Sequence, residues 1–308
     1  MRCDTPSGRP GFSAVTAVFR LTRAVRLVAG VAGAVGLAVI PAGLTGCTRP
    51  TVEPPTVVET PPALHPGFQL TRAELLALTG SQPDAVRSAI SDDPFGFLDQ
   101  LLPVLDLPHE ILVLVDKQHS LPADRHPDDL VSLAEFPGRI RYAAADRAVR
   151  RIMVDELLAM ADAARADGVN LIVQSAFRSY DFQATLFANY SARHGEDAAN
   201  RFSARAGQSQ HQLGTAVDFA PIGHQFTGTR DDVWLRQHAW RFGFSLSYPQ
   251  GFEEITGYIF EPWHYRYLGR ETTLLERDFF GGIQQFLLEF LHQYGDHFRS
   301  LRTPPVRE

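Results

Sequence analysis

Lysine and cysteine are both scarce in this chain of 308 residues, and each shortage excludes a class of enzyme. Lys117 is the only lysine, and Leu114 stands three residues before it, so the Ser-x-x-Lys motif of serine penicillin-binding enzymes is absent. Cysteine occurs only at Cys3 and Cys47, both at the N-terminal end. If residues 1–46 are removed as a leader, a cysteine nucleophile and an intramolecular disulfide are excluded as well.

Acidic residues outnumber basic residues, so the chain carries a net charge of −6. Its basic residues are almost all arginine. An acidic chain of this kind is a poor ligand for nucleic acid, so we expect no nucleic-acid partner. The pair His109-Glu110 begins like the His-Glu-x-x-His motif of metalloproteases, but Val113 stands where the second histidine is required. That metalloprotease class is therefore excluded.

The first 46 residues have the pattern of an export signal. Five arginines precede an uncharged apolar stretch, residues 27–46, which ends in the sequence Leu44-Thr45-Gly46-Cys47. This ending resembles a bacterial lipobox, and we expect Cys47 to be lipidated and to become the mature N-terminus. A plain N-terminal transmembrane anchor is the alternative. In both cases the remainder of the chain is extracytoplasmic, and the lipobox predicts a lipoprotein anchored to the cell membrane.

Composition divides the rest of the chain into four parts. Residues 47–66 are rich in proline and suit an extended tether that holds a domain away from a membrane, although a disordered linker has the same composition. Residues 67–107 have helical patterns, with Thr71 as a possible N-cap. Residues 108–270 form the expected catalytic domain, and residues 271–308 a helical extension.

Helical patterns alternate irregularly with short strand-like runs, which favours an α+β fold with an antiparallel sheet. The expected helices are 72–78, 85–90, 95–102, 143–167, 182–190, 233–242 and 283–294, and the expected strands are 111–115, 171–173, 215–219, 244–248 and 264–267.

Two short motifs carry the chemistry: Ser-Gln-His-Gln-Leu-Gly-Thr-Ala-Val-Asp at 209–218 and Glu-Pro-Trp-His at 261–264. They offer His211, Asp218 and His264 as nitrogen and oxygen ligands, and catalytic zinc sites use three protein ligands of these types. A carboxylate close by, Glu261, could accept a proton from water activated by the metal. The motifs predict a metal-dependent hydrolase, although the ligand types alone do not exclude other divalent metals.

Together these motifs resemble the D-alanyl-D-alanine carboxypeptidase (VanY-type) family of zinc peptidases, and the similarity extends over about residues 111–270. The segment 175–180 resembles that family's Ser-Gly-Tyr-Arg-Ser segment, with Ala176-Phe177 where Gly-Tyr is usual. The resemblance implies a small antiparallel sheet flanked by helices, of the Hedgehog/D,D-peptidase type, with zinc at the sheet. It also implies that the zinc is held by His211, Asp218 and His264.

The same resemblance implies the remaining roles and the substrate. Glu261 would be the general base and acid, and Arg178, after a buried strand, could bind the substrate carbonyl or the oxyanion. Gln183 and Ser209 are further candidates for binding the peptide carboxylate. The expected reaction removes the C-terminal D-Ala of peptidoglycan stem peptides. The alternatives are an L,D-carboxypeptidase, a cross-link endopeptidase, or an inactive zinc-containing module that binds the cell wall.

Overall fold

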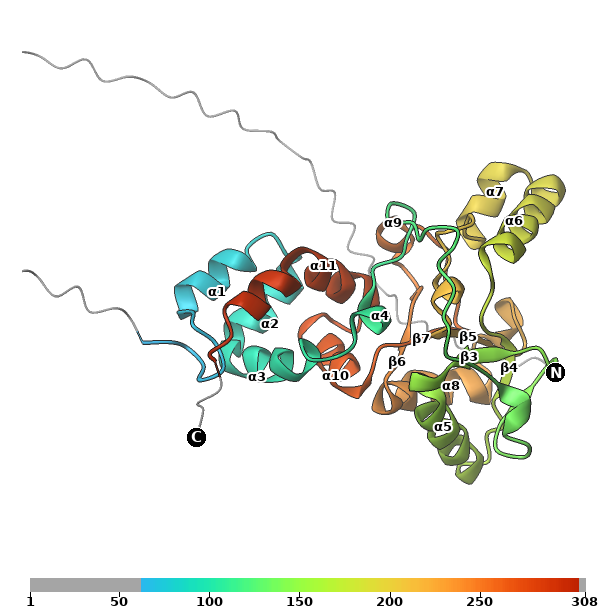
Figure 1. Cartoon of the computed structure of the whole chain (residues 1–308), viewed down its shortest axis with the longest axis horizontal. Helices are drawn as coiled ribbons and strands as arrows, with labels where there is room; N and C mark the ends of the chain where they lie inside the picture. Colours follow the sequence, from blue (N-terminus) through green and yellow to red (C-terminus); the bar gives the residue numbers. More distant parts are fainter. Residues whose placement is uncertain (1–61, 305–308) are drawn as a thin grey trace, which may run out of the picture. The chain divides into compact units, whose positions relative to one another are not determined.

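A five-stranded sheet positions the residues of both motifs. In the computed structural model, which describes residues 62–304, the strand order is β2-β4-β5-β7-β6 (Figure 1). Strands β2 and β4 are parallel, and every other neighbouring pair is antiparallel. The predicted α+β class with a small antiparallel sheet is confirmed. The strands of this sheet are β2 (Arg141–Tyr142), β4 (Ile172–Ser175), β5 (Ala216–Phe219), β6 (Phe244–Leu246) and β7 (His264–Tyr267).

The two faces of this sheet differ in chemistry because side chains alternate along each strand. Val217 is opposite Tyr265, and this face joins the main hydrophobic core. On the other face Asp218 is opposite His264, and Arg266 is opposite Ser245. All four of these polar residues are buried. The sheet therefore carries an apolar face that stabilises the domain and a buried polar face that can carry chemistry.

Helices from the two ends of the described chain pack on each other. Figure 1 shows α1, α2 and α3 grouped with α10 and α11. The ring of Phe97 in α3 lies 5.4 Å from that of Phe279 in α10 and 5.8 Å from that of Phe290 in α11. Thr71 caps α1, as predicted, and it also forms a capping box with Glu74. The segment 67–107 thus shares a core with the C-terminal extension.

One predicted strand is wrong, and one predicted helix begins too early. The run 111–115, expected as a strand, begins inside the short helix α4 and continues without strand pairing, because Arg266 donates to the carbonyls of Ile111 and Val113. The helix expected from residue 143 starts only at Val154. Before it, β3 pairs with β1 through Val149 and Val131, since burying these branched side chains against each other favours a strand.

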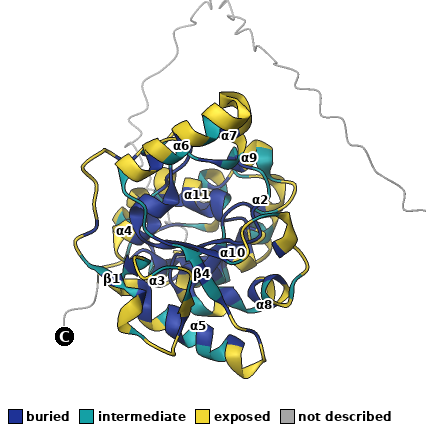
Figure 2. Cartoon of the chain, turned by 90° about the vertical axis from the view of Figure 1, so that its right-hand side faces the viewer, coloured by how far each residue is buried: buried dark blue, intermediate teal, exposed yellow. Residues whose placement is uncertain are grey.

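Helices α6 and α7 have wide solvent-exposed faces, drawn in yellow in Figure 2. No helix within residues 62–304 is both long and apolar enough to cross a bilayer. The expected leader, Cys47 and most of the proline-rich tether lie outside the described residues. The second, two-stranded sheet consists of β1 (Leu130–Ser132) and β3 (Ala148–Arg150). The α-helices are α1 (Arg72–Leu78), α2 (Asp84–Asp92), α3 (Pro94–Val104), α4 (His109–Leu112), α5 (Val154–Ala166), α6 (Tyr180–His194), α7 (Glu196–Phe202), α8 (Arg230–His238), α9 (Glu253–Thr256), α10 (Arg270–Phe279) and α11 (Gln284–Ser300).

Candidate metal centre and active site

A short turn brings the first two predicted ligands together. Ser209 caps a 3-10 helix, Gln210–Leu213, by accepting a hydrogen bond from the backbone N–H of His211. Gly214 then adopts a left-handed conformation, with φ of 72°, and the chain enters β5. A Cβ atom at Gly214 would lie 2.9 Å from Cγ of Arg150, so both the conformation and the space favour glycine. The turn therefore places His211 beside Asp218.

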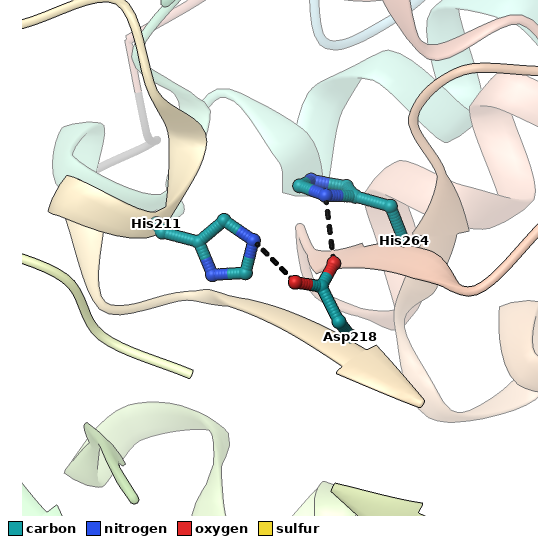
Figure 3. Close-up of side chains that lie close together, drawn as sticks. All are labelled: His211, Asp218 and His264. Carbon is teal, nitrogen blue, oxygen red and sulfur yellow. Dashed lines mark ion pairs between the residues drawn. The ribbon is translucent and has the colours of Figure 1, made fainter. Parts of the chain in front are cut away.

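The third predicted ligand arrives by strand pairing. His264, the first residue of β7, lies opposite Asp218 in the antiparallel ladder between β5 and β7. Figure 3 shows the carboxylate of Asp218 between the two imidazoles, with one oxygen directed at each. Nε2 of His211 is 3.1 Å from Oδ2, and Nδ1 of His264 is 3.0 Å from Oδ1. His211, Asp218 and His264 are only 1%, 2% and 4% exposed.

Each imidazole has its second nitrogen hydrogen-bonded away from the cluster. Nδ1 of His211 donates to the carbonyl of Ala176 at 2.7 Å, so its Nε2 carries the lone pair. Nε2 of His264 donates to the side-chain oxygen of Gln210 at 3.2 Å, so its Nδ1 carries the lone pair. Hydrogen bonds of this kind fix the tautomer of a metal-binding histidine.

The converging atoms fit a zinc ion. One ligand atom from each of the three residues lies within 4.8 Å of the other two. Oδ1 of Asp218 is buried and accepts no hydrogen bond, although Nδ1 of His264 is close, because two lone pairs face each other there. A buried acceptor without a partner is costly, and a cation between these atoms removes that cost. Two imidazoles and one carboxylate are ligands that zinc accepts in catalytic sites.

The ionisation states of His211 and Asp218 favour metal binding. Burial, assisted by the positive charge of Arg178, lowers the pKa of His211 to about 4, so its ring is neutral at physiological pH. Burial alone would raise the pKa of Asp218, but this pKa lies well below its ordinary value, and the positive charge of Arg178, which donates to Oδ2, lowers it. The cluster therefore presents a neutral imidazole and an ionised carboxylate without needing to release protons first.

Sequence comparisons identify the family. A family model described as D-alanyl-D-alanine carboxypeptidase, VanY, matches residues 146–270. A Bacillus subtilis protein, YodJ, whose name describes a carboxypeptidase, is 35% identical over 58% of this chain and 67% of its own length. The D-alanyl-D-alanine carboxypeptidase of Enterococcus faecalis is 36% identical over 52% of this chain and 59% of its own length. The chain belongs to the VanY family of D-alanyl-D-alanine carboxypeptidases.

The fold of one solved structure agrees with this assignment, and a second solved structure is similar in sequence. The LD-carboxypeptidase LdcB is 33% identical, covers 59% of this chain and 86% of its own, and superposes with a TM-score of 0.53. A VanY D,D-pentapeptidase variant from a VanB-type resistance cassette, solved with Zn(II), is 34% identical, covers 59% of this chain and 99% of its own, and has a TM-score of 0.48. Family membership and the fitting ligand set identify this VanY-family protein as a zinc metallopeptidase.

Glu261 lies beside the ligand cluster in the VanY-family site, on the loop that leads into β7. Its Oε2 is 3.7 Å from Nδ1 of His264, and the residue is buried. Burial, together with the negative charge of Asp218, raises the pKa of Glu261 well above its ordinary value. A dication held by the three ligands would oppose that shift, since an opposite charge favours the ionised carboxylate. The carboxyl of Glu261 therefore lies where it can exchange a proton with a group bound beside the cluster.

Arg178 reaches the same cluster from the loop after β4. Its Nη2 donates to Oδ2 of Asp218 at 2.6 Å and to Nε2 of His211 at 2.9 Å. Ser175 and Gln183 accept hydrogen bonds from its other nitrogens. Gln183 is fully buried and also donates to the carbonyl of Ala204, so in this structure its side chain fixes Arg178. Ser209, by contrast, lines the cavity directly.

A cavity of about 250 Å³ opens onto these groups. Arg178, Ser209, Glu261 and the three predicted ligands line its polar part. Its remaining walls are largely apolar or aromatic, from α6, α7 and the loops before β7: Leu186, Tyr190, Phe202, Ile222, Tyr248, Tyr258, Ile259 and Trp263. Sequence reasoning did not single out Tyr258 or Gln210. Gln210 could have been noticed from its place between Ser209 and His211, whereas nothing local marks Tyr258.

Proposed function

We propose that this VanY-family protein is a D,D-carboxypeptidase of the cell envelope that removes the C-terminal D-Ala from peptidoglycan stem peptides ending in D-Ala-D-Ala. One observation carries the proposal: two histidines and an aspartate converge in a buried cluster, with the carboxyl of Glu261 beside it, in a cavity open to solvent. The curated relative in Enterococcus faecalis with this activity supports the choice of substrate.

The proposed ligands are His211, Asp218 and His264. A zinc ion bound there supplies a Lewis acid that polarises a peptide carbonyl and makes water more acidic. Glu261 accepts a proton from the attacking water and passes it to the amine that leaves, so water and the peptide become a shortened peptide and free D-Ala. Its carboxyl lies 3.7 Å from Nδ1 of His264, beside the proposed ligands, which supports both halves of this transfer.

Arg178 and Ser209 are proposed to bind the substrate. The guanidinium of Arg178 lies in the cavity and can donate hydrogen bonds to the carbonyl oxygen on which negative charge develops. Gln183 holds that guanidinium by accepting from Nη1 at 3.2 Å, so its contribution to substrate binding runs through Arg178. The hydroxyl of Ser209, which lines the cavity, is proposed to interact with the terminal carboxylate of the peptide.

The N-terminal sequence supports a location outside the cytoplasm. Residues 1–46 would be removed as a lipoprotein signal peptide, Cys47 would carry the lipid, and residues 47–66 would be the tether between the membrane and the enzyme. Peptidoglycan and the membrane are then the two partners. Replacing Cys47 with alanine should abolish the incorporation of labelled lipid, and unchanged labelling would contradict this arrangement.

An L,D-carboxypeptidase is the second candidate, because the LD-carboxypeptidase LdcB is 33% identical over 59% of this chain. The same polar groups would serve that reaction. The cavity of about 250 Å³ is smaller than most ligand pockets, which are about 300–1,000 Å³. A small cavity suits the end of a peptide better than a cross-linked strand, which supports either carboxypeptidase over an endopeptidase.

The deciding experiment offers the purified full-length protein, loaded with zinc, a stem pentapeptide ending in D-Ala-D-Ala and the matching tetrapeptide, with products read by mass spectrometry. Loss of one D-Ala from the pentapeptide alone is expected. Cleavage of the tetrapeptide alone would indicate the L,D-enzyme. Bound zinc without cleavage of either peptide would favour the endopeptidase or the wall-binding module.

A further inference from the structure

The imidazole of His264 is hydrogen-bonded to Gln210, and Gln210 is hydrogen-bonded to a residue outside the region that matches the family model. Nε2 of His264 donates to Oε1 of Gln210 at 3.2 Å, and the hydroxyl of Ser247 donates to the same oxygen at 2.7 Å. His264, Gln210 and Ser247 are 4%, 2% and 3% exposed, so water does not compete for these bonds. The orientation of the Gln210 amide thus decides which nitrogen of His264 carries the proton.

Gln284, the first residue of α11, fixes that amide. Nε2 of Gln210 donates to Oε1 of Gln284 at 3.0 Å. Nε2 of Gln284 in turn faces the backbone carbonyl of Ser245 in β6, at 3.4 Å. Gln284 is 1% exposed and lies beyond residue 270, where the match to the VanY family model ends. A backbone carbonyl can only accept, so this chain of contacts has one consistent orientation.

We propose that Gln284 is a positioning residue, which acts through Gln210 to keep the lone pair of His264 Nδ1 directed at the metal position. The inference rests on the proposed ligand role of His264. If the Gln210 amide rotated by half a turn, its NH₂ group would face Nε2 of His264. The ring would then carry its proton on Nδ1, where Oδ1 of Asp218 is only 3.0 Å away. That proton would occupy the lone pair that the metal needs.

The structural consequence is that the C-terminal extension takes part in building the site. Helix α11 contributes no residue to the cavity wall, yet its first side chain lies two hydrogen bonds from a predicted ligand. The next residue, Gln285, is also buried, but its amide donates to Asp116 and Glu289 and forms no hydrogen bond with Gln210 or with the proposed ligands. These adjacent glutamines form a natural matched pair.

The test compares Gln284→Met with Gln285→Met in the full-length protein. Both remove a buried amide from the same turn of α11 and keep a side chain of similar length. Zinc affinity, measured by competition with a chromophoric chelator, should fall by about 10–100-fold in Gln284→Met, the range expected for partners of metal-ligating histidines. Gln285→Met should bind zinc like the wild type. Equal losses in the two variants would overturn the proposal, since general loosening of α11 would then explain them.

A second measurement follows the metal environment directly. Cobalt(II) in place of zinc gives visible absorption bands that depend on ligand geometry, and these bands should change in Gln284→Met and not in Gln285→Met. If Gln284→Met does not fold, as judged by thermal unfolding of the metal-free protein, Gln284→Asn makes the same comparison with a shortened amide. Unchanged bands and unchanged zinc affinity in the folded variant would contradict the inference.

Rescue provides the sharpest distinction. A glutamate at position 210 presents an acceptor oxygen to His264 in either orientation, so Gln210→Glu should restore most of the zinc affinity that Gln284→Met loses. Failure of the double variant to recover would overturn the proposed route through Gln210. All of these readouts are independent of substrate: a wild type that binds zinc but cleaves no stem peptide would refute the proposed reaction and leave this inference standing.

Discussion

Replacing Glu261 with glutamine isolates its proton-transfer role from its position. Glutamine has nearly the same shape and keeps the site polar, but it cannot take up a proton from water. Burial and the charge of Asp218 already raise the pKa of Glu261 well above its ordinary value, so an uncharged side chain suits this position in the metal-free protein. We therefore expect Glu261→Gln to fold normally and to have an unfolding temperature no lower than that of the wild type.

Catalysis should respond very differently. A positioned general acid or base contributes about 10²–10⁴-fold to a rate. Each tenfold corresponds to about 1.36 kcal/mol, so the barrier should rise by about 3–5 kcal/mol. Zinc affinity should change little, because Glu261 is not among the three converging ligands.

The assay measures kcat and KM for D-Ala release from the pentapeptide, with bound zinc quantified in the same samples. The control is Glu254→Gln, which neutralises an exposed carboxylate on α9 and should leave both constants unchanged. A fall in kcat of less than tenfold would refute the assignment of Glu261 as the proton carrier. A fall matched by an equal loss of zinc would instead make Glu261 a fourth ligand.

Three further predictions concern the metal, the pH dependence of stability and the helical layer. A chelator should abolish activity, and added zinc should restore it. The His211→Ala variant should not retain zinc after dialysis against micromolar metal. Burial raises the pKa of Glu276 from 4.5 to about 8, so the folded protein holds a proton there that the unfolded chain releases. Its stability to urea should then fall as the pH rises through that window, by at most about 5 kcal/mol, and Glu276→Gln should flatten the decline. Phe97→Ala should lower the unfolding free energy by about 3–5 kcal/mol in urea, because the fully buried ring contacts α10 and α11, whereas alanine at the half-exposed Phe95 should cost much less.

The sequence contains enough local information to find the proposed ligands. The sequence of residues 209–218 predicts a turn followed by a strand, and the structure has this conformation. The same holds for His264, which was expected to begin a strand and does. The residues that hold the ligands are less accessible to such reasoning. Gln210 and Gln284 are separated by 74 residues, and nothing in the local sequence at Gln284 marks it as a partner of Gln210.

The errors in the secondary structure also have long-range causes. Residues 143–150 have apolar positions compatible with a helix, but Val149 is paired with Val131 across a two-stranded sheet. The apolar run 111–115 suits a strand, but its carbonyls are satisfied by the guanidinium of Arg266, which lies more than 150 residues away. Local propensity is a weak guide wherever a distant partner supplies the hydrogen bonds.

The antiparallel pairing that sets Asp218 opposite His264 makes metal binding a check on correct folding. A slip of β7 by one residue would bring Tyr265 against Asp218 and would turn His264 toward the apolar core, since alternate residues face opposite sides. Misregistered chains would therefore lose their affinity for zinc together with their packing. In metal-poor conditions, newly synthesised molecules would lack this selection for the right register, so the yield of correctly folded protein should depend on zinc during folding and not only during catalysis.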